Sequence, residues 1–384
     1  MGAGPVGSYL AYKLAGYGYQ VIVLEQRAAV GEEVCCTGII GRECFDRFPV
    51  ANNAVLTGVR SINVFSPLGK LLKLRREEPL AYIVDRADFD RALAHRAMEE
   101  GAEYRTLAKV KDIAPGDESV AALVELNGQD DRIEGKIAVI CNGFGSVFPK
   151  KLGMGKIGDF VTGAQTEVGI NGLNEVEVYL GQNIAPGFFA WLVPISSDRA
   201  LVGLLTRKKP PFYLKKLVSE LTAIGKIISS GNEFIYRGIP LMPLPKSYAR
   251  RLLVAGDAAG HVKPTTGGGI YYGLLCADIA AKTVHEAMST GDLSAKSLSH
   301  YEMEWKKVLA KELQIGYLAR RLYENLSDKQ IEHIFGLIDA NDIHNEMLRS
   351  PDFSFDWHAE TIVRALKHKI LGKTITSITK SRFP

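Results

Sequence analysis

The most constraining feature of the chain is a glycine-rich turn at its start, with the sequence GAGPVG at positions 2–7. A stretch of helical character follows it, and then a short apolar run that ends at Glu25. Glycines at this spacing let a backbone approach a pyrophosphate, and the N-terminus of the following helix faces the negative charge. Glu25 stands at about the 20-residue distance at which an acidic side chain bonds an adenosine ribose. The segment therefore predicts a Rossmann-type dinucleotide site, with a ligand-free glycine-rich helix start as the alternative.

A Rossmann turn normally follows a buried strand, but only Met1 precedes Gly2. That first strand is central in a doubly wound sheet, so its loss removes ladder bonds and core contacts together. We therefore expect a Val/Ile-rich strand of about eight to ten further residues upstream. A chain started at Met1 is expected to be poorly soluble or free of its dinucleotide.

A second run with the same glycine spacing lies at positions 153–158. The residues before it, 148–151, do not form a buried strand, and those after it, 159–168, have the pattern of a strand instead of a helix. The structural context that the binding mechanism requires is therefore absent. We predict one dinucleotide site, not two.

Residues 88–101 predict an amphipathic crossover helix, because apolar residues recur there at helical spacing. Asp88 is expected to cap its start and Gly101 to end it. Arg86 stands just before this helix, where a guanidinium can reach a pyrophosphate.

The strongest signal lies far down the chain, where a buried strand at 251–255 runs into Gly256-Asp257. Gly267, Gly268 and Gly269 follow shortly before a helix expected at 271–281. A carboxylate at a strand end can bond a ribitol or ribose hydroxyl, and glycines at a helix start leave room for a flat ring and bare N–H donors. Together with the first turn, this pattern resembles FAD-dependent enzymes of the p-hydroxybenzoate hydroxylase type.

More narrowly, the chain resembles the geranylgeranyl reductase family, whose flavoenzymes saturate isoprenoid double bonds. Four segments carry the likeness: 33–40 with Cys36 at the family's cysteine position, 85–90 with its arginine, the PGFFAWLVP run at 186–194, and 256–270. The chain departs from the family pattern at Phe189, where the motif has tyrosine, at Val193, where it has a second aromatic, and at Thr37, where it has glycine. Asn142 stands where many flavin monooxygenases carry aspartate.

The resemblance implies FAD as a noncovalent cofactor and no metal. FAD contacts are expected at Gly2, Gly4, Val6, Gly7, Glu25, Arg27, Cys36, Thr37, Gly38, Ile39, Arg86, Ala108 (through its backbone), Asp257, Gly268, Gly269 and Ile270. Phe189 and Trp191 are expected on the substrate side, although Trp191 at strand spacing also fits an ordinary core residue.

Saturating an isolated alkene by hydride transfer requires a proton as well, because no carbonyl accepts the developing negative charge. By resemblance Cys36 is the expected catalytic acid, and inert packing against the flavin is the alternative. Tyr271 and Tyr272 are weaker candidates, for which aromatic packing is expected. His261 is expected to be a solvated loop residue.

These anchors predict an α/β protein in three parts. A Rossmann-like FAD-binding domain comprises residues 1–60, 81–150 and 246–290. A substrate-binding antiparallel sheet comprises 61–80 and 151–245, as alternation around Val176, Val178 and Leu180 indicates. Residues 291–384 are expected to be helical.

The C-terminal tail has an apolar stripe accompanied by six basic residues, and no acid follows Glu360. The stripe consists of Ile362, Val363, Leu366, Ile370 and Leu371, and the charges are Arg364, Lys367, Lys369, Lys373, Lys380 and Arg382. This pattern predicts either a surface helix on anionic lipid or a terminal helix packed on the protein with a solvated basic face.

The charge balance of 47 basic and 43 acidic residues argues against nucleic acid as a partner. The five cysteines lack zinc-ligand spacing, which favours a cytosolic, thiol-reduced chain. The expected partners are an isoprenoid or polyprenyl lipid substrate and an electron donor, which is NADPH, a ferredoxin or a quinol. A flavin-dependent monooxygenase or halogenase, and a non-catalytic flavin-binding protein, remain the alternative functions.

Overall fold

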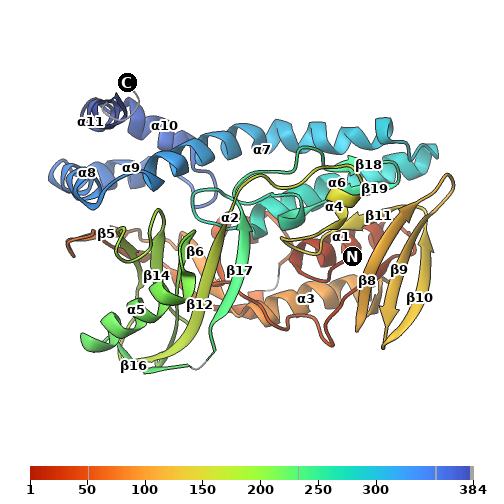
Figure 1. The fold of residues 1–384 in the computed structure, drawn as a ribbon, viewed down its shortest axis with the longest axis horizontal. Coiled ribbons are helices and arrows are strands. Elements are labelled where there is room, and N and C mark those ends of the chain that lie inside the picture. The colour runs from red at the N-terminus through yellow and green to blue at the C-terminus, as the bar shows by residue number, and fades with distance from the viewer. Residues whose placement is uncertain (51, 232, 351–352, 381–384) are drawn as a thin grey trace.

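The computed structural model describes residues 1–50, 52–231, 233–350 and 353–380, and it has two lobes (Figure 1). One lobe holds the N-terminus with helices α1 (Pro5–Gly16), α3 (Arg86–Glu99) and α6 (Ile270–Thr290). The other is built on a large twisted sheet. The long helix α7 (Ala295–Glu324) runs along both lobes and joins them. The expected α/β class is confirmed.

Short parallel strands form the centre of the first lobe. Strand β1 (Ile22–Leu24) pairs with β7 (Glu103–Arg105), and β11 (Ala138–Ile140) pairs with β19 (Leu252–Val254), which also carries β18 (Tyr248–Ala249). The backbone of Met1 lies between these two groups, since its N-terminal amine donates to Val139 O and its carbonyl accepts from Cys141 N. The Gly2 amide donates to Leu24 O at 2.8 Å. The expected upstream strand stays a prediction.

Helix α3 begins three residues earlier than a cap at Asp88 would place it. Asp85 is the N-cap, and its side chain accepts a hydrogen bond from the Asp88 amide at 2.9 Å. The prediction that Asp88 caps the helix and that Arg86 precedes it is therefore wrong, because Arg86 is the first helical residue. Asp85 is the cap because its own backbone is extended, which lets its carboxylate reach the third helical amide. Gly101 follows the last turn with φ +100°.

The other glycine-rich segments have the expected local structure. Helix α1 starts at Pro5, whose missing N–H suits a first turn. Helix α6 starts at Ile270 and ends against Gly291, which has φ +74°. The second glycine run lies in the connection between α4 (Phe148–Lys151) and β12 (Phe160–Ile170), and no helix follows it.

The large sheet of the second lobe has the order β16-β12-β15-β14-β13-β4-β5, with β17 also paired to β12. The strands are β4 (Ser61–Phe65), β5 (Leu71–Arg75), β12, β13 (Val176–Leu180), β14 (Phe189–Pro194), β15 (Arg199–Thr206), β16 (Ile227–Ser230) and β17 (Ile235–Pro240). All pairings are antiparallel except β13 with β4, which is parallel. The expectation of a purely antiparallel sheet is corrected there, because β4 joins from a distant part of the chain rather than through a hairpin.

Helix α5 (Pro210–Ala223) packs on the outer face of this sheet. The face of β13 opposite to Val176 and Val178 is buried as well. Glu177 on that face is 5% exposed, and both of its carboxylate oxygens accept from Lys226 Nζ at 2.7–2.8 Å. The opposite, apolar face of the sheet is turned to the first lobe.

Two small sheets complete the fold. Strand β6 (Ala81–Val84) pairs with both β2 (Ile39–Gly41) and β3 (Val55–Val59), and helix α2 (Arg42–Arg47) follows β2. Strands β8 (Ala108–Pro115), β9 (Val120–Leu126) and β10 (Gln129–Gly135) form a meander. The domain boundaries stay a proposal, which the presence of β4 and β5 in the large sheet favours.

The C-terminal region is helical, with α8 (Asp328–Ala340), α9 (Ile343–Arg349), α10 (Ala359–Lys367) and α11 (Lys369–Lys380) after α7. The expected single tail helix is two helices, because the backbone of His368 is extended at ψ 130°. Arg382 and the side chain of Lys380 lie outside the described part of the chain. None of the described helices combines the length and apolar character needed to cross a membrane.

Candidate functional site

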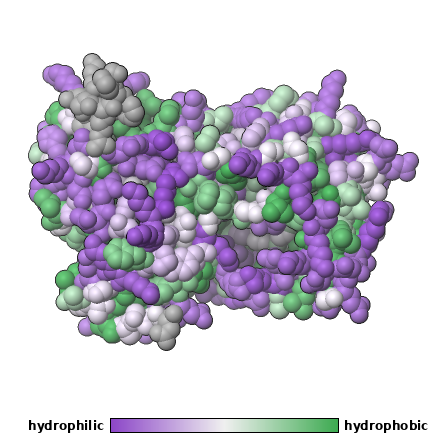
Figure 2. Space-filling model, viewed as in Figure 1, coloured by the Kyte–Doolittle hydropathy of each residue, from purple (hydrophilic) through white to green (hydrophobic). Residues whose placement is uncertain are grey.

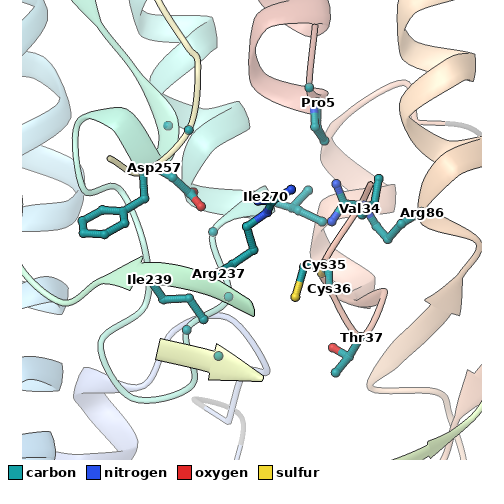
Figure 3. A pocket seen from close by; sticks show the side chains of 18 of the residues that line it. Pro5, Val34, Cys35, Cys36, Thr37, Arg86, Arg237, Ile239, Asp257 and Ile270 are labelled. Carbon is teal, nitrogen blue, oxygen red and sulfur yellow. The ribbon is translucent and has the colours of Figure 1, made fainter. Parts of the chain in front are cut away.

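A cavity of about 890 Å³ lies between the two lobes. Its walls include the first glycine turn, the glycine turn before α6, and the apolar face of the large sheet. The surface is hollowed between the lobes on the face shown in Figure 2, and Figure 3 shows the side chains around the cavity. The sequence motifs at positions 2–7, 33–40, 186–194 and 256–270 therefore meet in one place.

The glycine turn at positions 2–7 is open to the cavity on one side and tightly packed on the other. A Cβ on Gly2 would lie 2.6 Å from Cys141 O, and one on Gly7 would lie 2.0 Å from Gly2 O. A Cβ on Gly4, in contrast, would have no atom within 4 Å of it, and Gly4 lines the cavity. The backbone around Gly4 is thus open to a ligand at the N-terminus of α1, which fits a pyrophosphate group.

Glu25 is held beside this turn by backbone amides. Its carboxylate accepts from Ala3 N and from Arg27 N, both at 2.9 Å. Arg27 itself pairs with Glu33 at the cavity wall. Ala108 also lines the cavity, but its amide already donates to Glu25 O at 2.8 Å. Glu25 therefore presents a fixed acceptor to the cavity, as a ribose contact requires.

The 36–39 segment contains a turn at Gly38 that no other residue type fits. Gly38 has φ +71°, and a Cβ there would lie 2.3 Å from Val84 O. The Gly38 amide lies 3.5 Å from Cys36 Sγ, which orients the thiol. Thr37 and Ile39 line the same wall of the cavity. The side chain of Val6 lies on the opposite side, against the α6 turn.

Arg86 forms an i,i+4 ion pair with Asp90 at 2.9 Å inside the cavity wall. Burial alone lowers the pKa of Arg86, but the Asp90 carboxylate and the neighbouring Cys36 thiol raise it above its ordinary value. The guanidinium is therefore permanently charged beside the thiol. Its charge is partly balanced by Asp90, so Arg86 is not an isolated cation for a pyrophosphate.

Cys35 also lines the cavity, next to Cys36 (Figure 3). Burial, followed by the neighbouring Cys36, raises the pKa of the Cys35 thiol to about 11. Cys35 is therefore a protonated thiol at neutral pH. The sequence pointed only to Cys36, because the resemblance assigns a role to one cysteine position.

Asp257 and the glycine turn before α6 form the next wall. A Cβ on Gly269 would lie 2.5 Å from Asp257 Oδ1, and one on Gly268 would lie 2.8 Å from Lys263 Cε. Gly267 has φ +78°. These glycines allow the turn to pass between two charged side chains, and Ile270 begins the helix beyond it. The turn exposes backbone to the cavity where a side chain would fill it.

The apolar wall belongs to the large sheet. The rings of Phe189 and Trp191 lie 6.0 Å apart and are tilted by 57°. Trp191 is 9% exposed and belongs to a hydrophobic cluster, so it is both a core residue and part of the cavity wall. Other aliphatic residues of this wall are Ile62, Val176, Val178, Leu180, Val193, Leu205 and Ile239.

The structure places His261 away from the cavity lining. Its side chain is fully buried, and its ring lies 4.8 Å from that of Trp305. Burial lowers the pKa of His261 to about 3, so the ring is neutral. The expectation of a solvated loop histidine is wrong, because α7 covers the loop. Tyr271 lines the cavity, whereas the Tyr272 hydroxyl donates to Asp356 O at 2.8 Å.

Several cavity residues carry no signal that the sequence alone reveals. Arg237 reaches the cavity from β17 (Figure 3), and Lys263, Phe355 and Asp356 line it near the α6 turn. Lys263 lies inside a recognised motif, but nothing in the motif distinguishes it. Asp356 comes from a segment more distant in the chain, outside every motif. No cluster of three or more metal-ligating side chains occurs among the described residues.

The ionisation of Asp257 predicts that the stability of the ligand-free fold depends on pH in an unusual way. Burial raises the pKa of Asp257 to about 6, although Arg86 opposes the shift. The unfolded pKa is about 3.9, so the folded state holds the proton more tightly. The charged carboxylate therefore destabilises the ligand-free fold above pH 6, and this penalty disappears as the pH falls from about 6 to about 4.

We expect ligand-free Asp257→Asn to unfold at a higher temperature than the wild type at pH 8, with the difference shrinking between pH 6 and pH 4. Thermal unfolding followed by circular dichroism checks this. Asp278→Asn is the opposite-sign control, because burial raises the pKa of Asp278 but the hydrogen bonds and charges of Lys282 and Lys13 together outweigh burial and lower that pKa. A wild type more stable than Asp257→Asn at pH 8 would contradict the prediction.

Comparison with known proteins agrees with this geometry. The family model described as an FAD binding domain matches residues 1–210. Digeranylgeranylglycerophospholipid reductase 2 of Methanothermobacter thermautotrophicus is 30% identical over 359 residues, covering 89% of this chain and 91% of that protein. A second such reductase, from Methanocaldococcus jannaschii, is 30% identical over 347 residues, covering 86% and 88%.

The structure of a geranylgeranyl bacteriochlorophyll reductase-like protein from Thermoplasma acidophilum has a TM-score of 0.85 to this chain. It covers 99% of this chain and 97% of its own, at 22% identity, and so shows the shared fold. The resemblance seen in the sequence and the expectation of FAD are thereby confirmed. The chain belongs to the FAD binding domain family and, within it, to the digeranylgeranylglycerophospholipid reductases.

Proposed function

We propose that the protein is an FAD-dependent oxidoreductase that reduces C=C bonds of geranylgeranyl chains carried by a membrane lipid or its precursor. One observation carries the proposal: a single cavity extends from the bare backbone at Gly4 to the apolar wall at Phe189 and Trp191. The names of the related reductases support the substrate class. FAD supplies the hydride for such a reduction.

The residues of the first lobe are proposed to hold the cofactor. Gly4 offers open backbone to the pyrophosphate, Glu25 offers fixed oxygens to the ribose, and Asp257 offers a carboxylate at the second turn. Gly268 and Gly269 leave space for the flat ring. The cavity lining thus suits the cofactor of the family, with the two glycine turns side by side in one wall.

The large sheet is proposed to hold the isoprenoid. Its aliphatic and aromatic wall can replace water around a hydrocarbon chain, and each buried CH₂ contributes about 0.8 kcal/mol. The same wall keeps water away from the reacting carbons. Cys36, oriented by the Gly38 amide and bordered by Arg86, is the proposed source of the proton.

Two finer parts of the proposal concern partners. Electrons come from NADPH, a ferredoxin or a quinol, and the single glycine-rich dinucleotide motif argues against a second nucleotide domain for the donor.

The basic C-terminal helices are proposed to rest on an anionic lipid surface. In support, Lys367, Lys369 and Lys373 are exposed, and Leu366 beside them is 44% exposed.

The reaction is tested without oxygen and without the natural donor. Dithionite-reduced protein is mixed anaerobically with a geranylgeranyl lipid, and the product is analysed by mass spectrometry. We expect mass gains of two hydrogens per reduced bond and reoxidation of the flavin, because both electrons leave with the hydride. A product that forms only with oxygen and carries a new oxygen or halogen atom would establish the monooxygenase or halogenase alternative. Absence of any product would support a non-catalytic flavin-binding protein.

The role of the thiols is tested with a matched pair of variants. Cys36→Ala should lower turnover by about 10²-fold, since a positioned general acid contributes about 10²–10⁴. Its FAD affinity, measured by fluorescence titration, should remain close to that of the wild type. Cys35→Ala is the control and should retain most of the activity. A large loss of turnover in Cys35→Ala and not in Cys36→Ala would assign the proton to Cys35. Wild-type turnover in both variants would show that Cys36 only packs.

The lipid surface is tested by co-sedimentation with vesicles. Full-length protein should bind phosphatidylglycerol vesicles and not phosphatidylcholine vesicles at low salt. Lys367→Glu/Lys373→Glu should weaken this binding by at least tenfold, because each basic residue at such a surface contributes about 1 kcal/mol. Lys109→Glu/Lys136→Glu, in β8 and just after β10 of the distant meander, makes the same change in net charge. Equal loss in both variants would contradict a specific surface at α10 and α11.

A further inference from the structure

A buried ion pair stands in the cavity wall beside the glycine turn of α6. Lys263 is 5% exposed and Asp356 is 2% exposed, and Lys263 Nζ lies 2.7 Å from Asp356 Oδ1. The two residues come from distant parts of the chain, since Asp356 belongs to the segment between α9 and α10. Both residues line the cavity. The pair is therefore a charged feature of the expected flavin site and not of the protein surface.

The position of the ammonium group is tightly determined. The Lys263 amide donates to Gly268 O at 3.0 Å, and Lys263 O accepts from the Gly267 amide at 2.8 Å. The end of the side chain returns to the same turn, because a Cβ on Gly268 would lie 2.8 Å from Lys263 Cε and 3.4 Å from Nζ. Nζ also donates to Phe355 O at 3.2 Å. The charge is thus held against the turn that leaves space for a flat ring.

Structural stabilisation explains this pair poorly. Apolar residues of similar volume often replace a buried ion pair without loss of stability, because removing two charges from water is costly. The hydrogen bonding here is also incomplete. Among the described residues, Asp356 Oδ2 is buried without a partner, and it lies so close to Gly41 that a Cβ there would be 1.8 Å away. Most buried polar atoms have a hydrogen-bond partner, so the bare oxygen is a further cost of burying this pair.

We propose that Lys263 and Asp356 set the reduction potential of the bound flavin, Lys263 as the cation that stabilises the reduced form and Asp356 as its counter-charge. The proposal rests on FAD binding by this site and does not depend on the substrate. Two electrons and one proton convert the neutral oxidised ring into a form with one negative charge. A fixed cation nearby favours that form, and a fixed anion disfavours it.

The two partners therefore have opposite effects, which distinguishes an electrostatic role from a structural one. Removing the cation should make the flavin harder to reduce. Removing the anion should make it easier to reduce, because the cation is then uncompensated. Loss of packing, in contrast, would act in the same direction for both residues.

The experiment measures the midpoint potential of FAD-loaded protein by anaerobic dithionite titration against a reference dye, without substrate. Lys263→Met should shift the equilibrium at least tenfold toward oxidised flavin, which is about 30 mV for a two-electron couple. Asp356→Asn should shift it in the opposite direction, and the double variant should lie between the two. Lys311→Met and Glu360→Gln are the controls, because these residues form an exposed ion pair at 2.7 Å in the same region. The controls should leave the potential unchanged.

Shifts in the same direction for both single variants, or wild-type potentials in both, would overturn the proposal. A Lys263→Met protein that binds no FAD even in excess would assign Lys263 to holding the cofactor and would overturn it as well. Because no substrate is present, opposite shifts would support the proposal even if the anaerobic reduction assay gave no product. The two failures are therefore distinguishable.

Discussion

The site depends on how closely one turn of backbone packs between two strands. Met1 and Gly2 are hydrogen-bonded to residues of β11 and β1. No side chain fits at Gly2 or Gly7, because a Cβ on Gly2 would meet Cys141 O and one on Gly7 would meet Gly2 O. This packing leaves only the side at Gly4 bare. It also brings the Ala3 amide within 2.9 Å of the Glu25 carboxylate. The direction of α1 and the position of the Glu25 carboxylate both follow from this turn, so a change in its packing alters the whole wall at the proposed nucleotide site.

Val6 connects this turn to the second one. A Cβ on Gly273 would lie 2.4 Å from Val6 Cγ2, and one on Gly256 would lie 3.1 Å from it. The first turn of α1 therefore packs directly on the first turn of α6. Two helix N-termini face one cavity, and each contributes a partial positive charge. The Glu25 and Asp257 carboxylates lie beside these N-termini, and the large sheet supplies the apolar wall of the same cavity.

Local sequence patterns predicted the glycine turns, the single dinucleotide motif and the strand character of 159–168. These patterns gave a wrong prediction where two neighbouring residues could both cap a helix, and where a segment distant in sequence covers or pairs with the residues concerned. Asp85 and Asp88 are both plausible caps for α3, and backbone conformation decided between them. The solvated loop expected at His261 is buried because α7 covers it, and β13 pairs in parallel with β4 because that strand arrives from a residue range more than one hundred positions earlier.

By itself, the sequence determined the parts of the site whose chemistry depends on neighbours in the chain. The turn at 2–7, Glu25, Asp257 and the glycines at 267–269 act through short spacings that bring backbone and carboxylates to strand ends. Only the tertiary structure decided that Cys35 borders the same cavity as Trp191, and that Lys263 meets Asp356. Such contacts join elements that are far apart in the sequence, and no local sequence pattern indicates that they meet. They arise when the apolar face of the sheet and the C-terminal helices are buried against the nucleotide lobe, and that packing selects which charges become neighbours.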